Sequence, residues 1–190
     1  MSRALFPLFL DVSGRDVLVV GGGAVAERKV ADLLDAGASV RVVAKVATPA
    51  LVELARSGDI ALEERAFDRT DVSGAWLVFA ATDDAGAQKD AASACDEARV
   101  FCVAVDDPAN ASAYGGSIVR RGALTVAIST SGEAPAVAKL LREIFEQALP
   151  DEGWLEAARA LREKWKTSAT PMGSRFGELV RAFKEKAGSD

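Results

Sequence analysis

The sequence contains no histidine, only two cysteines and no long apolar run. Without histidine, the commonest general base and metal ligand are missing, so acid/base or metal chemistry must fall to carboxylates, hydroxyls, amines or a cofactor. Cys95 and Cys102 fit neither a disulfide framework nor a zinc pattern, which favours reduced thiols. No stretch approaches the roughly 20 apolar residues of a membrane span, and Pro7 and Asp11 interrupt the N-terminal stretch, which has no cleavage site of a signal peptide. We therefore expect a soluble, cytoplasmic protein that does not bind membranes.

The composition predicts a folded domain with a smaller appendage, because 49% of the 190 residues are hydrophobic and 27% are charged. The net charge of −5 argues against nucleic acid as a partner. Residues 154–186 nevertheless hold eight Lys or Arg against four Glu, a net charge of +4 that leaves −9 for the remainder. This basic segment is either a set of solvated helix faces or a surface that attracts a polyanionic small molecule.

A glycine triplet is the most informative motif of the chain. It follows the apolar run of residues 16–20 and opens an amphipathic stretch. Gly21, Gly23 and Ala26 match the G-x-G-x-x-G/A spacing, in which glycines permit a tight turn and bring backbone N–H groups close to a pyrophosphate. The motif predicts a dinucleotide site, and a simple turn is the alternative.

Strand and helix patterns alternate through residue 105. Apolar runs predict strands at residues 16–20, 39–43, 60–64, 76–80 and 100–105, with helices between them, including one at 48–58 that Thr48 and Pro49 begin. Such alternation is typical of a parallel sheet, in which ligands bind at the carboxyl ends of the strands. We expect residues 21–24, 82–84 and 106–107 to gather at that edge.

The pattern changes after Pro108. Residues 117–120 and 124–129 predict a hairpin, and Pro135 begins a long amphipathic helix. A lone hairpin is marginal in water, so it should extend another sheet or pair with a second copy. Two further helices are expected at residues 154–166 and 175–186. The fold class is thus α/β: a Rossmann-type parallel sheet (residues 1–113), a hairpin-plus-helix dimerisation segment (114–150) and a C-terminal helical domain (151–190).

Several motifs, in this order and spacing, give the chain its resemblance to a known family. They are residues 7–10 (PLFL), 19–29 (VVGGGAVAERK), 80–84 (AATDD), 105–106 (VD), 127–135 (AISTSGEAP) and 140–142 (LLR). The chain resembles the precorrin-2 dehydrogenase/sirohydrochlorin ferrochelatase family, the N-terminal module of siroheme synthase. The resemblance implies a homodimer that oxidises precorrin-2 to sirohydrochlorin with NAD and that, in some members, also inserts ferrous iron.

The resemblance also assigns roles to individual residues. It places the catalytic carboxylate on Asp106, which suits a reaction in which hydride leaves for NAD⁺ while a proton is shed elsewhere. From the residues alone, an Asx turn into proline is the preferred interpretation of Asp106-Asp107-Pro108, and the resemblance reverses that preference. No residue is assigned to a resident metal. The implied cofactor contacts are Gly21, Gly22, Gly23, Ala24, Val25, Lys45, Val46, Thr82 and Asp83.

Hydroxyl and cationic side chains of the second half are the candidates for binding the substrate. Ser129, Thr130 and Ser131 lie between a strand and a helix, where they bind carboxylate arms of a tetrapyrrole or cap the helix. Arg120 and Arg142, with Arg121 and Lys139, are further candidates for those arms, because guanidinium groups bind carboxylates bidentately.

Some features depart from the family pattern or leave alternatives open. Val103, residues 113–116, Ser131 and Ala134 differ from the residues usual around the substrate loop. No acidic residue ends the second strand and Lys45 stands nearby, so NADP is an alternative to NAD. The competing functions are a non-catalytic NAD(H)-sensing module and a chelatase without redox activity. The sequence leaves open the metal and the end product of the pathway.

Overall fold

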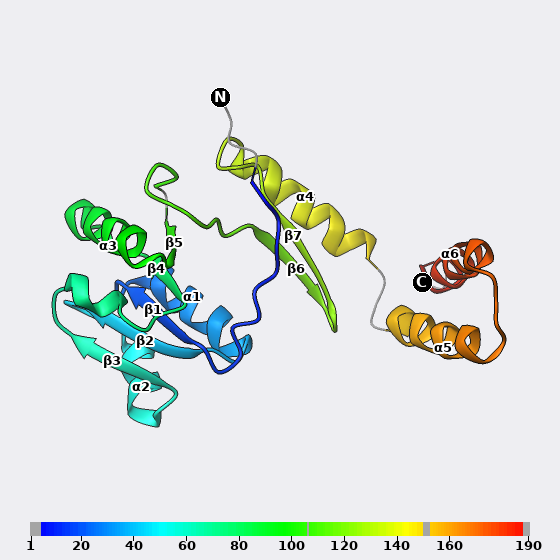
Figure 1. Ribbon diagram of the computed structural model, residues 1–190, viewed down its shortest axis with the longest axis horizontal. Coiled ribbons are helices and arrows are strands. Elements are labelled where there is room, and N and C mark those ends of the chain that lie inside the picture. The colour runs from blue at the N-terminus through cyan, green and yellow to red at the C-terminus, as the bar shows by residue number, and fades with distance from the viewer. Residues whose placement is uncertain (1–4, 106, 150–152, 188–190) are drawn as a thin grey trace. The chain divides into compact units, whose positions relative to one another are not determined.

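The computed structural model describes residues 5–105, 107–149 and 153–187. The chain divides into two compact units, Met1–Gly115 and Gly116–Asp190 (Figure 1). The α/β class is confirmed: a parallel sheet with its helices forms the first unit, and a hairpin with three helices forms the second. The predicted boundary between a dimerisation segment and a helical domain falls at residue 150, outside the described residues, and stays a prediction.

The first unit is built on five parallel strands in the order β3-β2-β1-β4-β5. The chain leaves β1, the central strand, through the glycine triplet and crosses to β2 on one side, and it later returns to β4 on the other side. The triplet therefore lies where the strand order reverses, which is where parallel sheets bind ligands. The elements are β1 (Asp16–Val20), α1 (Ala24–Asp35), β2 (Ser39–Ala44), α2 (Pro49–Ser57), β3 (Ile60–Glu64), the 3-10 helix η1 (Arg69–Val72), β4 (Leu77–Ala80), α3 (Ala85–Ala98) and β5 (Phe101–Ala104).

The sheet is buried on both faces, which explains the unbroken apolar runs of the sequence. Val17 and Val19 of β1 pack in one cluster with residues of α1 and α2. Leu18 and Val20 alternate to the other face and pack with η1 and α3. Each of these side chains contributes about 1.5–3 kcal/mol through burial. The central strand, and with it the glycine turn, is thus held rigidly.

Local capping fixes where the helices begin and end. Thr48 caps α2 by accepting the N–H of Leu51 at 3.4 Å, and Gly58 ends the helix with φ +85°, as predicted. Asp84 caps α3 by accepting the N–H groups of Gly86 and Ala87, each at 3.1 Å. The sequence did not predict η1, whose capping box is too short to give a periodic apolar pattern.

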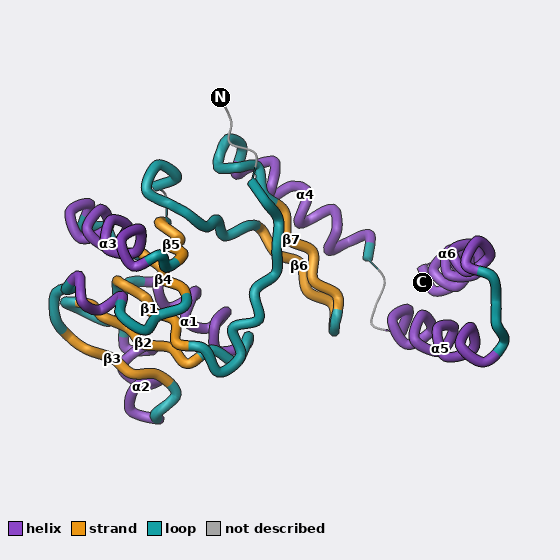
Figure 2. The backbone as a smooth tube through the Cα atoms, viewed as in Figure 1, coloured by secondary structure: helices purple, strands orange, loops and turns teal. Residues whose placement is uncertain are grey.

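The second unit contains two pairs of packed elements (Figure 2). Helix α4 packs on the hairpin, with Val119 and Ala138 buried. Helices α5 and α6 pack against each other, with the rings of Trp154 and Phe183 edge to face at 5.7 Å. The predicted start of the last helix at residue 175 is wrong, because Pro171 ends the preceding loop and the helix begins directly after it. The elements are β6 (Ser117–Arg121), β7 (Leu124–Ile128), α4 (Pro135–Ala148), α5 (Gly153–Thr167) and α6 (Met172–Ala187).

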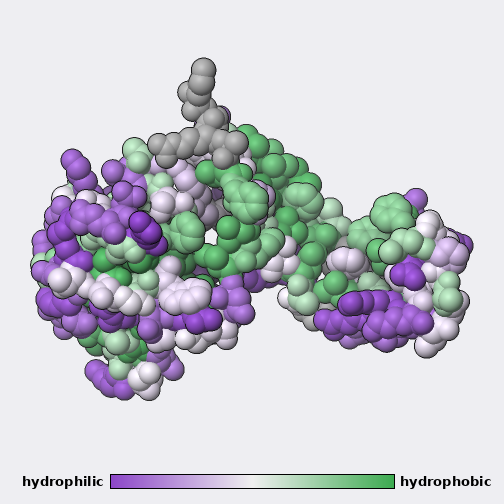
Figure 3. Space-filling view, viewed as in Figure 1, coloured by the Kyte–Doolittle hydropathy of each residue, from purple (hydrophilic) through white to green (hydrophobic). Residues whose placement is uncertain are grey.

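Helix α4 carries an uncovered apolar face within its unit, and hydrophobic colour gathers over this helix in Figure 3. Its members recur at helical spacing, and each is 36–55% exposed. We call this row the α4 stripe; it comprises Val137, Leu140, Leu141, Ile144 and Phe145. None of the helices within the described ranges is long and apolar enough to cross a membrane.

Candidate functional site

A cavity of about 460 Å³ opens at the carboxyl edge of the parallel sheet. It is lined by residues 20–25 after β1, residues 43–46 at the end of β2, residues 65–67 after β3, and residues 81–84 after β4. The structure therefore brings all nine sequence-predicted cofactor residues to one cavity. They are Gly21, Gly22, Gly23, Ala24, Val25, Lys45, Val46, Thr82 and Asp83.

The three glycines of the turn serve different purposes. A Cβ on Gly21, whose φ is +122°, would lie 2.1 Å from the carbonyl oxygen of Ala81, and one on Gly22 would lie 2.2 Å from that of Val46. These two glycines let the turn pack against the ends of the neighbouring strands. A Cβ on Gly23 would meet no atom of the described residues within 4 Å, although Gly23 lines the cavity. The backbone there leaves room for a ligand.

The N-terminus of α1 faces the open space at Gly23. Gly23 is the N-cap, and no side chain of the described residues caps the helix. The first N–H groups of a helix have no intrahelical partner and carry the positive end of its dipole, so they favour an anion such as a diphosphate. The glycine turn, the open space at Gly23 and this helix terminus together fit a dinucleotide.

Lys45 and Asp84 join the ends of β2 and β4 across the cavity rim. Lys45 Nζ lies 3.1 Å from Asp84 Oδ2. The backbone N–H of Ala87 and then Lys45 lower the pKa of Asp84 below its ordinary value. Thr82 Oγ1 accepts the N–H of Asp84 at 3.2 Å. Lys45, the basic residue that the sequence places at the end of β2, therefore already forms an ion pair with Asp84.

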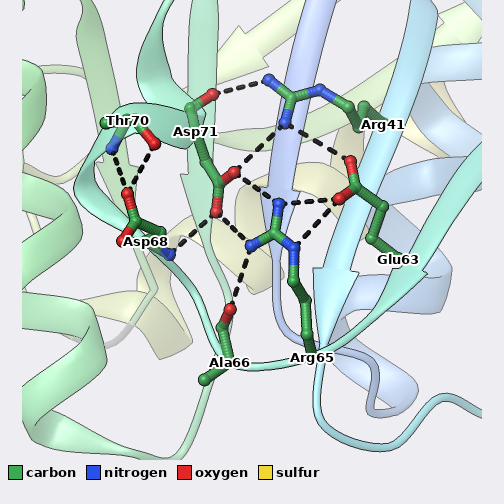
Figure 4. Close-up of polar contacts among 7 residues, drawn as sticks. All are labelled: Arg41, Glu63, Arg65, Ala66, Asp68, Thr70 and Asp71. Carbon is green, nitrogen blue, oxygen red and sulfur yellow. Dashed lines mark hydrogen bonds and ion pairs between the residues drawn. The ribbon is translucent and has the colours of Figure 1, made fainter.

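A network of charges that sequence reasoning missed lies beside the cavity (Figure 4). Arg65, which lines the cavity, donates to Asp71 at 2.6 and 2.8 Å and to Glu63 at 2.7 and 3.0 Å. The side chain of Asp71 is only 6% exposed, and the hydrogen bonds from Arg65 hold the pKa of its carboxyl below the ordinary value. Arg41 lies 3.7 Å from the same carboxylate. The capping box of η1 was the only local signal for this network.

Asp106, the predicted catalytic residue, lies outside the described residues. The backbone that leads to it is anchored at the same sheet edge, because the N–H of Val105 donates to the carbonyl of Ala80 at 3.0 Å. Gln88 of α3, nearly buried, donates to the carbonyl of Val105 at 2.6 Å. Asp107 does not line the cavity, and its carboxylate accepts from the Asn110 amide at 2.6 Å.

The predicted substrate residues belong to the second unit. Ser129 Oγ accepts the N–H of Ser131, whose φ is +55°, and Thr130 Oγ1 accepts the N–H of Ala134. These hydroxyls shape the loop before α4, and within the described residues the N-cap of this helix, Ala134, makes no side-chain cap bond to it. Arg142 of α4 pairs with Glu143 and Glu146 of its own helix. Arg120 lies on β6.

The two thiols are free and buried in the first unit, between α3 and β5. Hydrogen bonding with Cys102 and burial raise the pKa of the Cys95 thiol above its usual range. These groups are inert core residues and are no part of the cavity. Among the described residues there is no cluster of His, Cys, Asp or Glu that could hold a metal ion.

Comparisons with known proteins place these features in context. Residues 8–117 match the family described as putative NAD(P)-binding, and residues 121–148 match the sirohaem biosynthesis protein central family. The chain is 44% identical over 171 residues to siroheme synthase 3 of Aeromonas hydrophila, covering 89% of this chain and 36% of that protein. It is 41% identical over 182 residues to siroheme synthase of Citrobacter koseri, covering 95% and 39%. The chain thus spans less than two fifths of the length of these relatives.

A solved structure shows a similar fold. The structure of SirC, a precorrin-2 dehydrogenase, matches with a TM-score of 0.74 and 21% sequence identity, covering 93% of this chain and 88% of that chain. At this identity the likeness concerns the fold.

Proposed function

Because the chain belongs to the NAD(P)-binding family that its residues 8–117 match, we propose that it is a precorrin-2 dehydrogenase of siroheme biosynthesis. The reaction oxidises precorrin-2 to sirohydrochlorin with NAD⁺. The observation that carries the proposal is the cavity at Gly23, which gathers the nine predicted cofactor residues at one sheet edge. The similarity to siroheme synthases and to the fold of a precorrin-2 dehydrogenase supports the choice of substrate.

Different residues of the chain have different roles in this reaction. NAD⁺, when bound, supplies the hydride acceptor. Residues 21–25 bind the diphosphate through backbone N–H groups, and Lys45, Val46, Thr82 and Asp83 surround the rest of the dinucleotide. Oxidation removes a hydride and a proton from the macrocycle. We assign the proton to the carboxylate of Asp106, because residue 106 follows β5 in the sequence, and the described end of that strand is hydrogen-bonded to the end of β4, next to cavity residues 81–84.

The charges at the rim favour NAD over NADP. Lys45 already pairs with Asp84, and Arg65 pairs with Asp71 and Glu63. A 2′-phosphate would have to compete with these carboxylates for its cations. The ribose of NAD carries no 2′-phosphate and therefore needs no free cation.

Substrate binding and assembly belong to the second unit. The tetrapyrrole carries carboxylate arms, for which Arg120, Arg142 and the hydroxyls of Ser129, Thr130 and Ser131 are the proposed partners. Arg142 would exchange its intrahelical carboxylates for those of the substrate. A second copy of the chain covers the α4 stripe, whose apolar side chains are exposed within the unit, and forms a homodimer.

The decisive experiment is an anaerobic assay of the full chain with precorrin-2 and NAD⁺ or NADP⁺, read by the absorbance of the product with and without Fe²⁺. We expect sirohydrochlorin to form with NAD⁺. Asp106→Asn should lose turnover but keep its fold and NAD⁺ affinity, whereas Asp107→Asn, the same change one residue later, should stay active.

Other outcomes of this assay identify the competing functions. NAD⁺ binding without oxidation or tetrapyrrole binding would indicate a sensing module. Metal insertion that needs no dinucleotide would indicate a chelatase. An unchanged turnover of Asp106→Asn would remove the role given to that carboxylate.

A further inference from the structure

The side chain of Arg65 is held at the cavity with every N–H group bonded. A guanidinium has five N–H donors in one plane. Nε donates to Glu63 Oε2 at 3.0 Å, Nη1 to Asp71 Oδ2 at 2.8 Å and to the carbonyl of Ala66 at 3.0 Å, and Nη2 to Glu63 Oε2 at 2.7 Å and Asp71 Oδ1 at 2.6 Å. These five bonds use the whole edge of the group (Figure 4). Its flat face is what remains for a ligand.

This guanidinium plane is fixed before any ligand binds. Asp71, the carboxylate that holds Arg65 through two bonds, itself accepts the backbone N–H of Asp68 at 2.8 Å and lies near Arg41. The side chain of Arg65 is nevertheless 40% exposed. A ligand that uses the plane therefore costs little additional side-chain entropy.

The surroundings of the plane are apolar and close to neutral. Val46 also lines the cavity, and 78% of its surface is exposed, so its apolar side chain is accessible to a ligand. Phe67 and Ala66 line the same part. Arg41 and Arg65 offset the charges of Glu63 and Asp71. This corner suits a flat uncharged ring better than a further phosphate.

The strand order shows which half of a dinucleotide would reach this corner. Val46 and Arg65 come after β2 and β3, which lie on one side of β1, whereas β5 lies on the other side (Figure 1). In the proposed reaction the reacting ring lies toward the end of β5, which Asp106 follows in the sequence, so the non-reacting end of the dinucleotide lies toward β2 and β3. That end is the adenosine.

We propose that Arg65 binds the adenine ring by stacking the face of its guanidinium on the purine, with the side chain of Val46 flanking the ring. The proposal rests on the proposed dinucleotide site and deepens it. Stacking of a guanidinium on an aromatic ring is favourable, and a side chain whose donors are all occupied can offer only this contact.

Calorimetric titration of the full chain with ADP and with ribose 5-diphosphate tests the proposal, because these ligands share the ribose and the diphosphate and differ in the base. Arg65→Lys keeps the charge but removes the plane. We expect it to weaken ADP binding about 3- to 10-fold and to leave ribose 5-diphosphate within about twofold. Arg56→Lys is the matched control, because Arg56 lies on α2, is 73% exposed and pairs only with Glu53 among the described residues.

Three results would overturn the proposal. Equal weakening of both ligands would make Arg65 a phosphate ligand, and unchanged binding of both would leave it without a role in binding. Tighter binding of 2′-phospho-ADP than of ADP, lost in Arg65→Lys, would make the corner an anion site. This test is independent of the activity assay. A loss of ADP affinity that depends on the base supports the stacking role even if the chain does not oxidise precorrin-2.

A second variant covers the case in which Arg65→Lys does not fold, which a thermal melt detects. Glu63→Ala removes a side chain that is 43% exposed and keeps the paired bonds between Arg65 and Asp71. The carboxylate of Asp71 then holds the guanidinium plane of Arg65 without the bonds to Glu63. We expect ADP affinity to fall by about twofold and ribose 5-diphosphate affinity to stay unchanged, and the reverse pattern would refute the stacking role.

Discussion

Replacement of Gly23 by alanine should separate nucleotide binding from folding. The added Cβ would meet no atom within 4 Å in the part of the chain that the structure describes, and Gly23 has φ −83°, which alanine adopts without strain. Alanine is a poorer N-cap than glycine, so we expect a loss of less than about 1 kcal/mol in the free energy of unfolding. The methyl group would occupy the space that the diphosphate needs.

The effect on binding follows from the hydrogen bonds at the start of α1. A hydrogen bond to a charged group contributes about 1.5–3 kcal/mol, and 1.4 kcal/mol corresponds to tenfold in affinity. Displacement of the diphosphate from a single backbone N–H should therefore weaken NAD⁺ binding at least about tenfold.

Gly21→Ala is the contrasting variant. Its Cβ would lie 2.1 Å from the carbonyl oxygen of Ala81, at a φ of +122°. Overpacking and backbone strain together cost about 2–5 kcal/mol, a large part of the stability of an ordinary domain. Urea unfolding followed by circular dichroism measures stability, and calorimetry measures NAD⁺ affinity. A Gly23→Ala protein that binds NAD⁺ like the wild type would refute the placement of the diphosphate.

Three further predictions concern other parts of the chain. Asp71→Asn should lower the free energy of unfolding by about 2–3 kcal/mol in urea melts at pH 7, because it breaks a nearly buried ion pair. The pKa of Asp71 is depressed in the folded state, so its contribution is present above its unfolded pKa of about 3.9 and is lost as the pH falls through the folded pKa; the wild type should lose stability below about pH 4 more steeply than Asp71→Asn. Leu141→Glu in the α4 stripe should convert the proposed dimer to monomer in analytical ultracentrifugation, whereas Lys139→Glu, on the same helix and 71% exposed, should not. Cys95 and Cys102 should react with a thiol reagent only on unfolding, and labelling of the native chain within minutes would contradict their burial.

The sequence predicted those parts of the fold that local patterns determine. Thr48, Pro49 and Gly58 bound α2 as their conformational preferences require, and the apolar runs predict each strand of the parallel sheet to within one or two residues. The glycine triplet likewise predicted the cavity, because Gly21 and Gly22 are residues that a close backbone approach demands.

The Arg65 network was out of reach of the same reasoning. Glu63, Arg65 and Asp71 lie on or after an edge strand, where charged residues are usually solvated, and no periodic pattern joins them to Arg41 on β2. Their geometry exists only after β2 and β3 pair. The role of Asp106 stays a prediction, because that residue lies outside the described ranges.

The two carboxylate oxygens of Asp84 bind different partners. Oδ1 accepts the N–H groups that start α3, while Oδ2 receives Lys45. Lys45 can therefore be substituted, for example to alter coenzyme choice, without loss of the cap of α3. Position 84 has no such freedom, and a protein engineer should begin at the lysine.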